Sequence, residues 1–374
     1  MIRFALALGL FLFFIGCSNA PEKPSPKPLK RITELVGLNE IESVALGGGD
    51  RTGLIPAFKD GLIAAASASG EVYTFDTELN ELWSIDLDRS IFAGVGMSNT
   101  AVYVITADAA LVALSLADGA VIFEVSLPGN ALVPPIATEA LVFVKTQIGR
   151  LLALDPRTGR TVWIEEAQGS GIGIRGGSPM TLSGNTLFVL WESGRLIAYQ
   201  TQTGRILWER QVAVARGRSL LERIVDSKGA PSVRNGLVAV STRNGQVSLR
   251  DSASGQLVWS FDADAYSGAL LAFNTVTVIE TDGTVSSFGT SSGELLWTTE
   301  ELQYRELSPP SVIGDFIGVM DFEGKLHLLD PANGLIVGRL NVGSSKGIVA
   351  PVGTKKGALI QLVDGNLSLV ELVP

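Results

Sequence analysis

Few side chains in this chain of 374 residues could do chemistry. The one histidine, His327, lies in the apolar run Lys325-Leu-His-Leu-Leu-Asp330, and the one cysteine, Cys17, follows an N-terminal apolar segment. A single histidine cannot build a multi-histidine metal site, and no acidic loop has calcium-ligand spacing. We therefore expect His327 to be structural, and the sequence predicts no catalytic site, no metal and no cofactor.

The segment from Gly171 to Gly176 has glycines spaced as in a phosphate-binding loop. Such a loop connects a parallel strand to the start of a helix, and neither is expected around this segment. The formal net charge of −9 also argues against a nucleic-acid partner. The remaining chemistry is a covalent modification, and Cys17 is the residue that could carry it.

Cys17 follows an apolar run of thirteen residues, from Phe4 to Gly16, which is too short to span a membrane as a helix. A small residue directly before a cysteine resembles a bacterial lipoprotein signal. That resemblance implies cleavage before Cys17, a lipid on the new N-terminus, and, with Ser18 as the next residue, sorting to the outer membrane. The alternative is an ordinary signal peptide with an incidental cysteine.

The segment after the cysteine, from Ser18 to Lys30, carries four prolines among charged residues. It cannot bury a core and is expected to be an extended tether of roughly 40 Å, at about 3.1 Å per residue. We accordingly predict a signal peptide at 1–16, a lipidated cysteine and tether at 17–31, and one folded domain at 32–374.

The folded part repeats one unit, whose cleanest copy runs from Gly149 to Trp163 as Gly-Arg-Leu-Leu-Ala-Leu-Asp-Pro-Arg-Thr-Gly-Arg-Thr-Val-Trp. The second glycine suits the positive φ of a hairpin turn, and the tryptophan gives the next strand a large ring to bury. Five tryptophans take this position: Trp83, Trp163, Trp208, Trp259 and Trp297. The eight units begin at Gly70, Ala109, Gly149, Gly194, Gly245, Gly283, Gly324 and Gly365.

A period near forty residues with several short strands per period predicts an all-β fold, an eight-bladed β-propeller of four-stranded antiparallel blades. Unrelated hairpins in a sandwich are the alternative. The last unit runs out of chain before its outer strand. We expect the alternating segment Ile41 to Leu46 to supply that strand, which would close the ring and hide two sheet edges.

Two connections are longer than the rest and stretch the repeat interval to 45 and 51 residues. They run from Glu165 to Ser178 and from Gln211 to Pro231, and each joins an outer strand to the next inner strand. Such connections share one face of a propeller, so the two form a neighbouring pair. Exposed aliphatic and arginine side chains, here Ile172, Ile174 and Arg175, are typical of protein-docking sites. Tolerated surface insertions are the alternative.

The repeat from Gly149 to Trp163 is similar to that of quinoprotein dehydrogenases. With eight units and a lipoprotein signal, the whole chain resembles the propeller lipoproteins of the outer-membrane β-barrel assembly (Bam) machinery. Ile172-Gly-Ile174-Arg175-Gly resembles that family's Leu-Ser-Leu-Arg-Gly loop, whose apolar residues and arginine contact the periplasmic POTRA domains of the barrel subunit.

The second long connection carries a further resemblance. Arg223-Ile-Val-Asp226-Ser-Lys228 resembles the family's Arg-Leu-Ser-Asp-Val-Asp, in which both aspartates matter. Asp226 matches the first aspartate, and Lys228 replaces the second and inverts its charge. The resemblance thus implies partner-binding roles for Arg223 and Asp226 beside Ile172, Ile174 and Arg175.

What the resemblance implies is a non-catalytic scaffold on the periplasmic face of the outer membrane, anchored through Cys17 in the inner leaflet. Its partners would be the POTRA domains of the barrel subunit and unfolded outer-membrane proteins. A dehydrogenase that uses pyrroloquinoline quinone is one alternative, although its vicinal disulfide cannot form with one cysteine. A scaffold of another envelope complex is the other.

Overall fold

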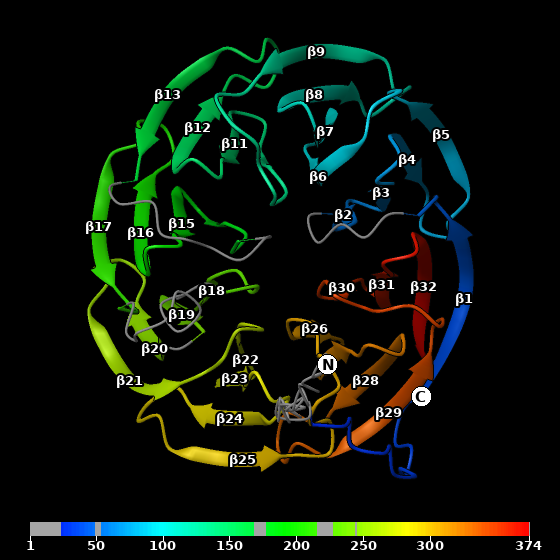
Figure 1. Cartoon of the computed structure of the whole chain (residues 1–374), viewed down its shortest axis with the longest axis vertical. Helices are drawn as coiled ribbons and strands as arrows, with labels where there is room; N and C mark the ends of the chain where they lie inside the picture. Colours follow the sequence, from blue (N-terminus) through cyan, green and yellow to red (C-terminus); the bar gives the residue numbers. More distant parts are fainter. Residues whose placement is uncertain (1–23, 49–53, 168–176, 215–226, 244, 374) are drawn as a thin grey trace, which may run out of the picture.

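A ring of blades is the frame of the molecule. The computed structural model describes residues 24–48, 54–167, 177–214, 227–243 and 245–373, and within them thirty-two strands form eight four-stranded antiparallel sheets (Figure 1). Each sheet is one blade, and seven blades are consecutive meanders from an inner to an outer strand. The predicted eight-bladed propeller is confirmed.

The first four blades follow the chain from residue 57 to residue 211. Blade 1 contains β2 (Ala57–Lys59), β3 (Leu62–Ala66), β4 (Glu71–Phe75) and β5 (Glu81–Asp86). Blade 2 contains β6 (Ile91–Met97), β7 (Ala101–Thr106), β8 (Ala110–Ser115) and β9 (Val121–Ser126). Blade 3 contains β10 (Ile136–Ala137), β11 (Val142–Lys145), β12 (Arg150–Leu154) and β13 (Thr161–Glu166). Blade 4 contains β14 (Thr181–Ser183), β15 (Thr186–Leu190), β16 (Arg195–Gln200) and β17 (Ile206–Gln211).

The other four blades complete the ring. Blade 5 contains β18 (Ser232–Arg234), β19 (Leu237–Ser241), β20 (Gly245–Asp251) and β21 (Leu257–Ala263). Blade 6 contains β22 (Ala269–Ala272), β23 (Thr275–Ile279), β24 (Val285–Gly289) and β25 (Leu295–Thr299). Blade 7 contains β26 (Ser311–Ile313), β27 (Phe316–Met320), β28 (Lys325–Leu329) and β29 (Ile336–Asn341). Blade 8 contains β30 (Val352–Gly353), β31 (Gly357–Gln361), β32 (Asn366–Val373) and, from the other end of the chain, β1 (Gly37–Ala45).

The core lies between neighbouring blades rather than within any one of them. Between blades 2 and 3, Tyr103 and Leu111 pack with Val142 and Leu152. The second strand of a blade is covered on both faces, which is why every residue of β7 and β11 is buried and all but the last residue of each, Thr106 and Lys145, are apolar. Outer strands such as β13 alternate between exposed and half-buried residues because only one face is covered.

The alternation of strands gives the ring two distinct faces. The connections from outer to next inner strand, such as 167–180, leave on one face, which we call the connection face. The hairpin turns between third and outer strands, such as the turn at Gly204, lie on the other, which we call the hairpin face. Gly204 has φ of +73°, and a Cβ atom there would lie 2.8 Å from the Trp163 ring of the preceding blade, so both conformation and space require glycine.

Every outer strand carries a β-bulge at the same place. In blade 4 the register shifts at Ala198, which pairs with Trp208 just after the bulge. In blade 8 the equivalent shift lies between Glu40 and Glu42, although β1 comes from the opposite end of the chain. The repeat geometry is therefore kept even where the repeat sequence is absent.

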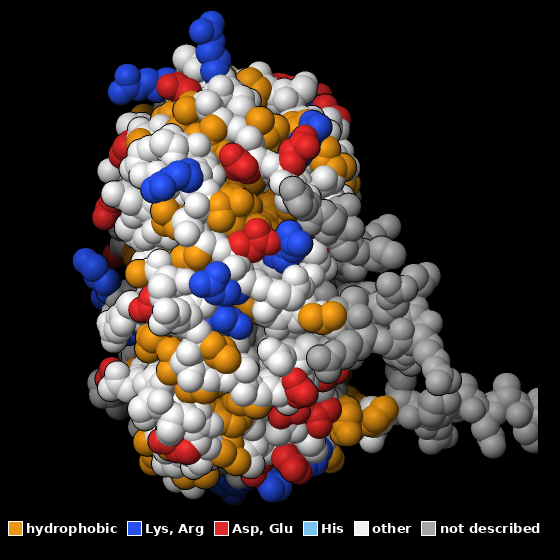
Figure 2. Space-filling view, turned by 90° about the vertical axis from the view of Figure 1, so that its left-hand side faces the viewer, with side chains coloured by type: hydrophobic (Ala, Val, Ile, Leu, Met, Phe, Trp, Pro, Cys, Tyr) orange, Lys and Arg blue, Asp and Glu red, His pale blue; other side chains and the backbone are white. Residues whose placement is uncertain are grey.

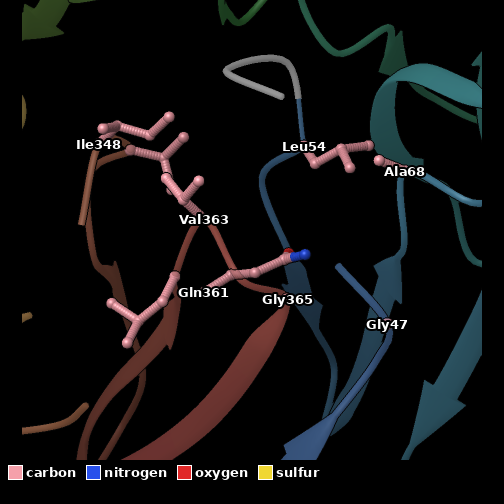
Figure 3. Close-up of a pocket in the computed structure, with 9 residues that line it drawn as sticks. Gly47, Leu54, Ala68, Ile348, Gln361, Val363 and Gly365 are labelled. Carbon is pink, nitrogen blue, oxygen red and sulfur yellow. The ribbon is translucent and has the colours of Figure 1, made fainter. Parts of the chain in front are cut away.

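The ring closes as expected, because β1 pairs antiparallel with β32 along their lengths, from Gly37 opposite Val373 to Ala45 opposite Asn366. Where β1 ends, Gly47 and Gly365 approach closely and flank a small cavity (Figure 3). Figure 3 shows Leu54 on the blade 1 side of it and Val363 on the blade 8 side. The closure is thus a continuous sheet on the rim and a tight glycine contact just beyond the end of β1.

The residues before β1 do not hang free. From Lys27 to Val36 the chain runs beside the outer edge of blade 7, with Leu35 N donating to Val337 O at 2.9 Å. Leu29 and Ile32 pack against the apolar cluster between blades 6 and 7. We call Lys27–Val36 the strap. The boundary of the tether at residue 31 stays a prediction, but its last residues already belong to the contact with the propeller.

Candidate partner-docking face

The residues predicted to dock a partner are Ile172, Ile174, Arg175, Arg223 and Asp226, and they lie outside the described residues, as does Cys17. Their roles stay predictions. What the structure does place is the strands and turns from which the two long connections leave and to which they return. Those ends settle whether the two connections are neighbours.

The two connections return to the propeller side by side. The first joins β13 to β14 and the second joins β17 to β18, so each runs from an outer to an inner strand on the connection face. Ser178 Oγ, at the end of the first, donates to Gly229 O, at the end of the second, at 2.7 Å. Thr181 Oγ1 adds a bond of 2.6 Å to Pro231 O. The pair expected from the sequence is therefore joined directly.

A buried lysine holds the return of the first connection. The Lys145 side chain is 3% exposed, and its ammonium donates to Ser178 O at 3.2 Å and to Leu190 O at 2.9 Å. It also pairs with Glu192 at 2.9 Å and lies 5.3 Å from the centre of the Trp191 ring. Four partners compensate the buried charge, so this site is rigid and polar. The repeat pattern gave no signal for it, because Lys145 sits in a strand that is otherwise apolar.

Lys228, at the end of the second connection, faces an aromatic ring. Its ammonium lies 5.5 Å from the centre of the Tyr266 ring, and its backbone N donates to Tyr266 O at 2.8 Å. Burial lowers the pKa of Lys228 below its usual value, and the negative charge of Glu306 offsets this in part. Within the described residues, no carboxylate makes an ion pair with Lys228. Its charge is therefore turned toward the propeller.

A groove opens at the root of the second connection. It has a volume of about 590 Å³ and lies between the outer ends of β17 and β21, with Val212, Val214 and Asp262 among its walls. Val214 is 55% exposed. Figure 2 shows the rim over blades 3 to 5, where apolar side chains lie among charged ones. These apolar side chains come from three outer strands and are Val162, Ile164, Ile206, Leu207, Leu257 and Val258.

His327 is fully buried in β28, and both of its ring nitrogens are hydrogen-bonded. Arg339 Nε donates to His327 Nδ1 at 3.1 Å, so Nδ1 is the acceptor and Nε2 carries the proton. That proton is donated to Asp321 Oδ2 at 2.9 Å. Burial lowers the pKa of His327, which keeps the ring neutral. The prediction of a structural histidine is confirmed.

Asp321 is the centre of this buried network. Burial alone would raise its pKa, but hydrogen bonds from His327 and Arg305 hold the pKa at about 2. Arg305, whose side chain is 4% exposed, also donates to the backbone O of Lys27 at 3.3 Å. Arg339 donates to Lys30 O at 2.9 Å. The network therefore fastens the strap, a role that no sequence pattern indicated.

The described residues contain no group of three or more metal-ligating side chains. They also contain no helix of the length and apolar character needed to cross a membrane. The features that remain are the repeated tryptophan–glycine contacts, the joined connections and the fastened strap. Together they define a class of protein, the eight-bladed β-propellers built from tryptophan-bearing repeats.

Comparison with known proteins narrows this class. A family model described as outer membrane protein assembly factor BamB matches residues 68–299 and 233–362. The match covers most of the chain, and the chain therefore belongs to the BamB family. The resemblance inferred from the repeat and the two connections is confirmed.

Individual relatives agree over nearly the full length. The chain is 32% identical to outer membrane protein assembly factor BamB of Pseudomonas aeruginosa, over 94% of this chain and 93% of the relative. It is 28% identical to that of Bordetella pertussis, over 98% and 96%. The crystal structure of BamB from Moraxella catarrhalis superposes with a TM-score of 0.82 at 27% identity, covering 89% of this chain and 99% of that one.

A more distant neighbour shares the fold alone. Quinohemoprotein alcohol dehydrogenase from Comamonas testosteroni superposes with a TM-score of 0.70 at 13% identity, over 92% of this chain and 78% of that one. The similarity extends to the arrangement of the strands only. It carries no argument about activity.

Proposed function

We propose that the protein is a non-catalytic scaffold of the outer-membrane β-barrel assembly machinery, which docks on the POTRA domains of the barrel subunit and supports assembly of outer-membrane proteins. The chain matches relatives named outer membrane protein assembly factor BamB over nearly their whole length. The observation that carries the docking face is the bond between Ser178 and Gly229, because it joins the ends of the two connections whose residues resemble the family's contact loops.

The geometry suits docking better than catalysis. The single histidine is buried with both ring nitrogens bonded, so it cannot exchange protons with a substrate. The two connections instead rise from a rigid base, in which Lys145 and Ser178 fix the first and Gly229 fixes the second. Loops held on a rigid scaffold are a common way to build a binding surface.

The test is an affinity purification from detergent-solubilised native membranes. Wild type is compared with Arg175→Ala/Asp226→Ala, and the co-purifying proteins are identified by mass spectrometry. We expect a POTRA-bearing outer-membrane barrel with wild type and at least a tenfold loss with the variant. Recovery of other envelope proteins in its place would favour the scaffold of another complex.

A matched control separates docking from folding. Arg160→Ala/Asp315→Ala removes one arginine and one aspartate from exposed turns on the hairpin face, away from the two connections. This control should recover the barrel as wild type does. If it loses the barrel equally, the connections are not the docking site.

We also propose that Cys17 carries the lipid and that the protein lies on the periplasmic face of the outer membrane. The proposal rests on the apolar run that ends at Gly16 and on the family match. Mass spectrometry of the N-terminal peptide should show acyl groups on Cys17, and Cys17→Ser should release the protein from membranes. Binding of pyrroloquinoline quinone in a fluorescence titration would instead revive the dehydrogenase alternative.

A further inference from the structure

The junction between blades 4 and 5 has two arginines where the junction between blades 5 and 6 has phenylalanine rings. In the latter, the centre of the Phe261 ring lies 5.7 Å from that of Trp259 and 4.4 Å from that of Phe288. Phe261 follows the repeat tryptophan by two residues, and Phe288 pairs with the residue two before the tryptophan of its own blade. The three rings fill this junction with apolar surface.

Repeat position and strand register assign Arg210 and Arg250 to the two phenylalanine places. Arg210 follows Trp208 by two residues, as Phe261 follows its own tryptophan. Arg250 pairs with the residue two before the tryptophan of its blade, which is the register of Phe288. In the other seven units the place of Arg250 is taken by an apolar or aromatic residue: Phe75, Leu114, Leu154, Tyr199, Phe288, Leu329 and Val370. The arginine is therefore a property of this one junction and not of the repeat.

Both guanidinium groups converge on the hairpin turn of blade 5, between β17 and β20 (Figure 1). Arg210 Nε and Arg250 Nη1 each donate to Gly255 O at 3.2 Å. Arg210 also donates to Ser254 O at 2.8 Å and to Glu209 O at 2.7 Å. Two positive charges that share one acceptor repel each other, and the repulsion adds to the cost of burying them.

Arg250 leaves most of its hydrogen-bonding capacity unused. It is 8% exposed, and one of its five N–H donors has a partner within the described residues. Its Nε is buried and makes no hydrogen bond to any described residue. Burial, together with the charge of Arg210, lowers the pKa of Arg250. An anion that accepted these free donors would stabilise the charged side chain.

The nearby carboxylates of the described chain do not supply that anion. Asp251 is adjacent in sequence, but its Oδ1 accepts from Ser254 N at 2.8 Å and from Ser254 Oγ at 2.6 Å. Glu209 pairs with Arg195 at 2.8 Å. Arg210 and Ser254 are half-buried, so the two guanidinium groups border solvent at the turn. This part of the hairpin face thus offers donors to an anion and no carboxylate of its own.

We propose that Arg210 and Arg250, which we call the arginine pair, bind a phosphate group on the hairpin face. A phosphate group carries close to two negative charges near neutral pH, so one group balances both arginines, whereas a carboxylate would balance one. The planar guanidinium fork also matches the spacing of phosphate oxygens. The site lies on the face opposite the two long connections, so it does not depend on the proposed POTRA contact.

Isothermal titration calorimetry of the full-length protein with sodium phosphate tests the proposal, near neutral pH and at constant ionic strength. We expect saturable binding of one phosphate per chain with wild type. Arg210→Phe/Arg250→Phe copies the rings of the next junction, so it should remain folded and bind phosphate at least tenfold more weakly. Arg205→Gln removes an exposed arginine from the hairpin turn of blade 4 and should bind phosphate as wild type does.

Two further measurements identify the source of the phosphate group and keep the test independent of the double variant. If glycerol 3-phosphate binds as tightly as inorganic phosphate, the group is carried on an organic molecule such as a lipid, and weaker binding indicates the free ion. Arg250→Lys keeps the charge but removes the planar fork, so it should weaken binding several-fold even if the double variant does not fold.

Four results would overturn the proposal. They are the absence of saturable binding to wild type, equal affinity of wild type and the double variant, unchanged affinity in Arg250→Lys, and an equal loss in Arg205→Gln. Acetate that competes as well as phosphate would also contradict it, because the occupant would then be a carboxylate.

Discussion

Blade junctions inside the chain differ in chemistry from the place where the strap meets blade 7. A regular junction is neutral: Trp259 covers Gly293 and makes one bond to a backbone carbonyl. Besides its apolar and backbone contacts, the strap is held by charged groups, because Arg305 and Arg339 donate to its carbonyls and both belong to the network around Asp321. Apolar burial responds little to pH, whereas ionised groups respond directly. We infer that pH sensitivity is concentrated where the chain fastens its own end.

The largest effect on stability is expected from removing the tryptophan ring at a regular blade junction. Trp208→Ala deletes a ring that is 6% exposed and leaves a cavity on Gly255, so it should cost about 3–5 kcal/mol of unfolding free energy. Equilibrium denaturation measures it. The neighbouring Leu207, which is 41% exposed, is the control, and Leu207→Ala should change stability by less than about 0.5 kcal/mol. Similar losses of stability in the two variants would mean that the buried tryptophan contributes no more than the exposed leucine.

Breaking the charged network around Asp321 should cause the next largest loss of stability. Arg305→Ala leaves Asp321 buried with one partner fewer, and removal of one member of a buried ion pair typically costs about 3 kcal/mol or more. Arg89 provides the contrast, because it makes two bonds of 2.7 and 2.9 Å to Glu124 on an exposed strand. Arg89→Ala should cost at most about 1 kcal/mol. If chemical denaturation finds the two variants equally stable, the buried network contributes no more than a surface pair.

The pH dependence should follow the neutral state of His327. Burial places its folded pKa below the usual value of 6.5, so the unfolded chain takes up the proton first. The contribution to stability is therefore complete above about pH 6.5 and falls below it, by at most about 1.4 kcal/mol per pH unit. Between pH 7 and 5 the wild type should lose more stability than His327→Gln. Parallel curves for the two proteins would contradict this assignment.

The smallest effect should come from the exposed pairs of the strap. Lys27 and Lys30 pair with Glu300 and Glu301 at 3.1 and 3.0 Å, all on the surface. Lys27→Ala/Lys30→Ala should leave global stability within about 1 kcal/mol of wild type. Hydrogen exchange of the amide of Leu35, which is bonded to Val337 O, should nevertheless quicken if these pairs help to seat the strap. An unchanged exchange rate of the Leu35 amide would mean that Arg305 and Arg339, and not the lysine pairs, hold the strap against the propeller.

The sequence predicted the features that repeat and missed those that do not. The spacing of Gly204 and Trp208 specifies a turn and a buried ring, and eight copies specify the ring of blades. The closing strand followed from a unit that lacked its last element. The strap could not be predicted, because proline-rich, charged segments are typical of tethers, and its contacts involve backbone carbonyls that no side-chain pattern encodes.

The candidate sites divide in the same way. The neighbouring long connections were evident from two irregular intervals, and Ser178 and Gly229 confirm that they meet. Lys145 was hidden in an apolar strand, since one lysine among apolar residues carries no periodic signal.

The bulge that recurs in every outer strand bears on how rings behave at high concentration. Apart from β29, which the strap partly covers, the outer strands expose sheet edges, and straight edges of this kind could pair with those of another molecule. The shift beside Trp208 in β17, and its counterpart beside Glu42 in β1, bends each edge partway along its length. A strand from another molecule could then pair with such an edge for only a few residues before the hydrogen-bond register was lost. The same irregularity that seats the tryptophan also protects the rim against stacking into fibres.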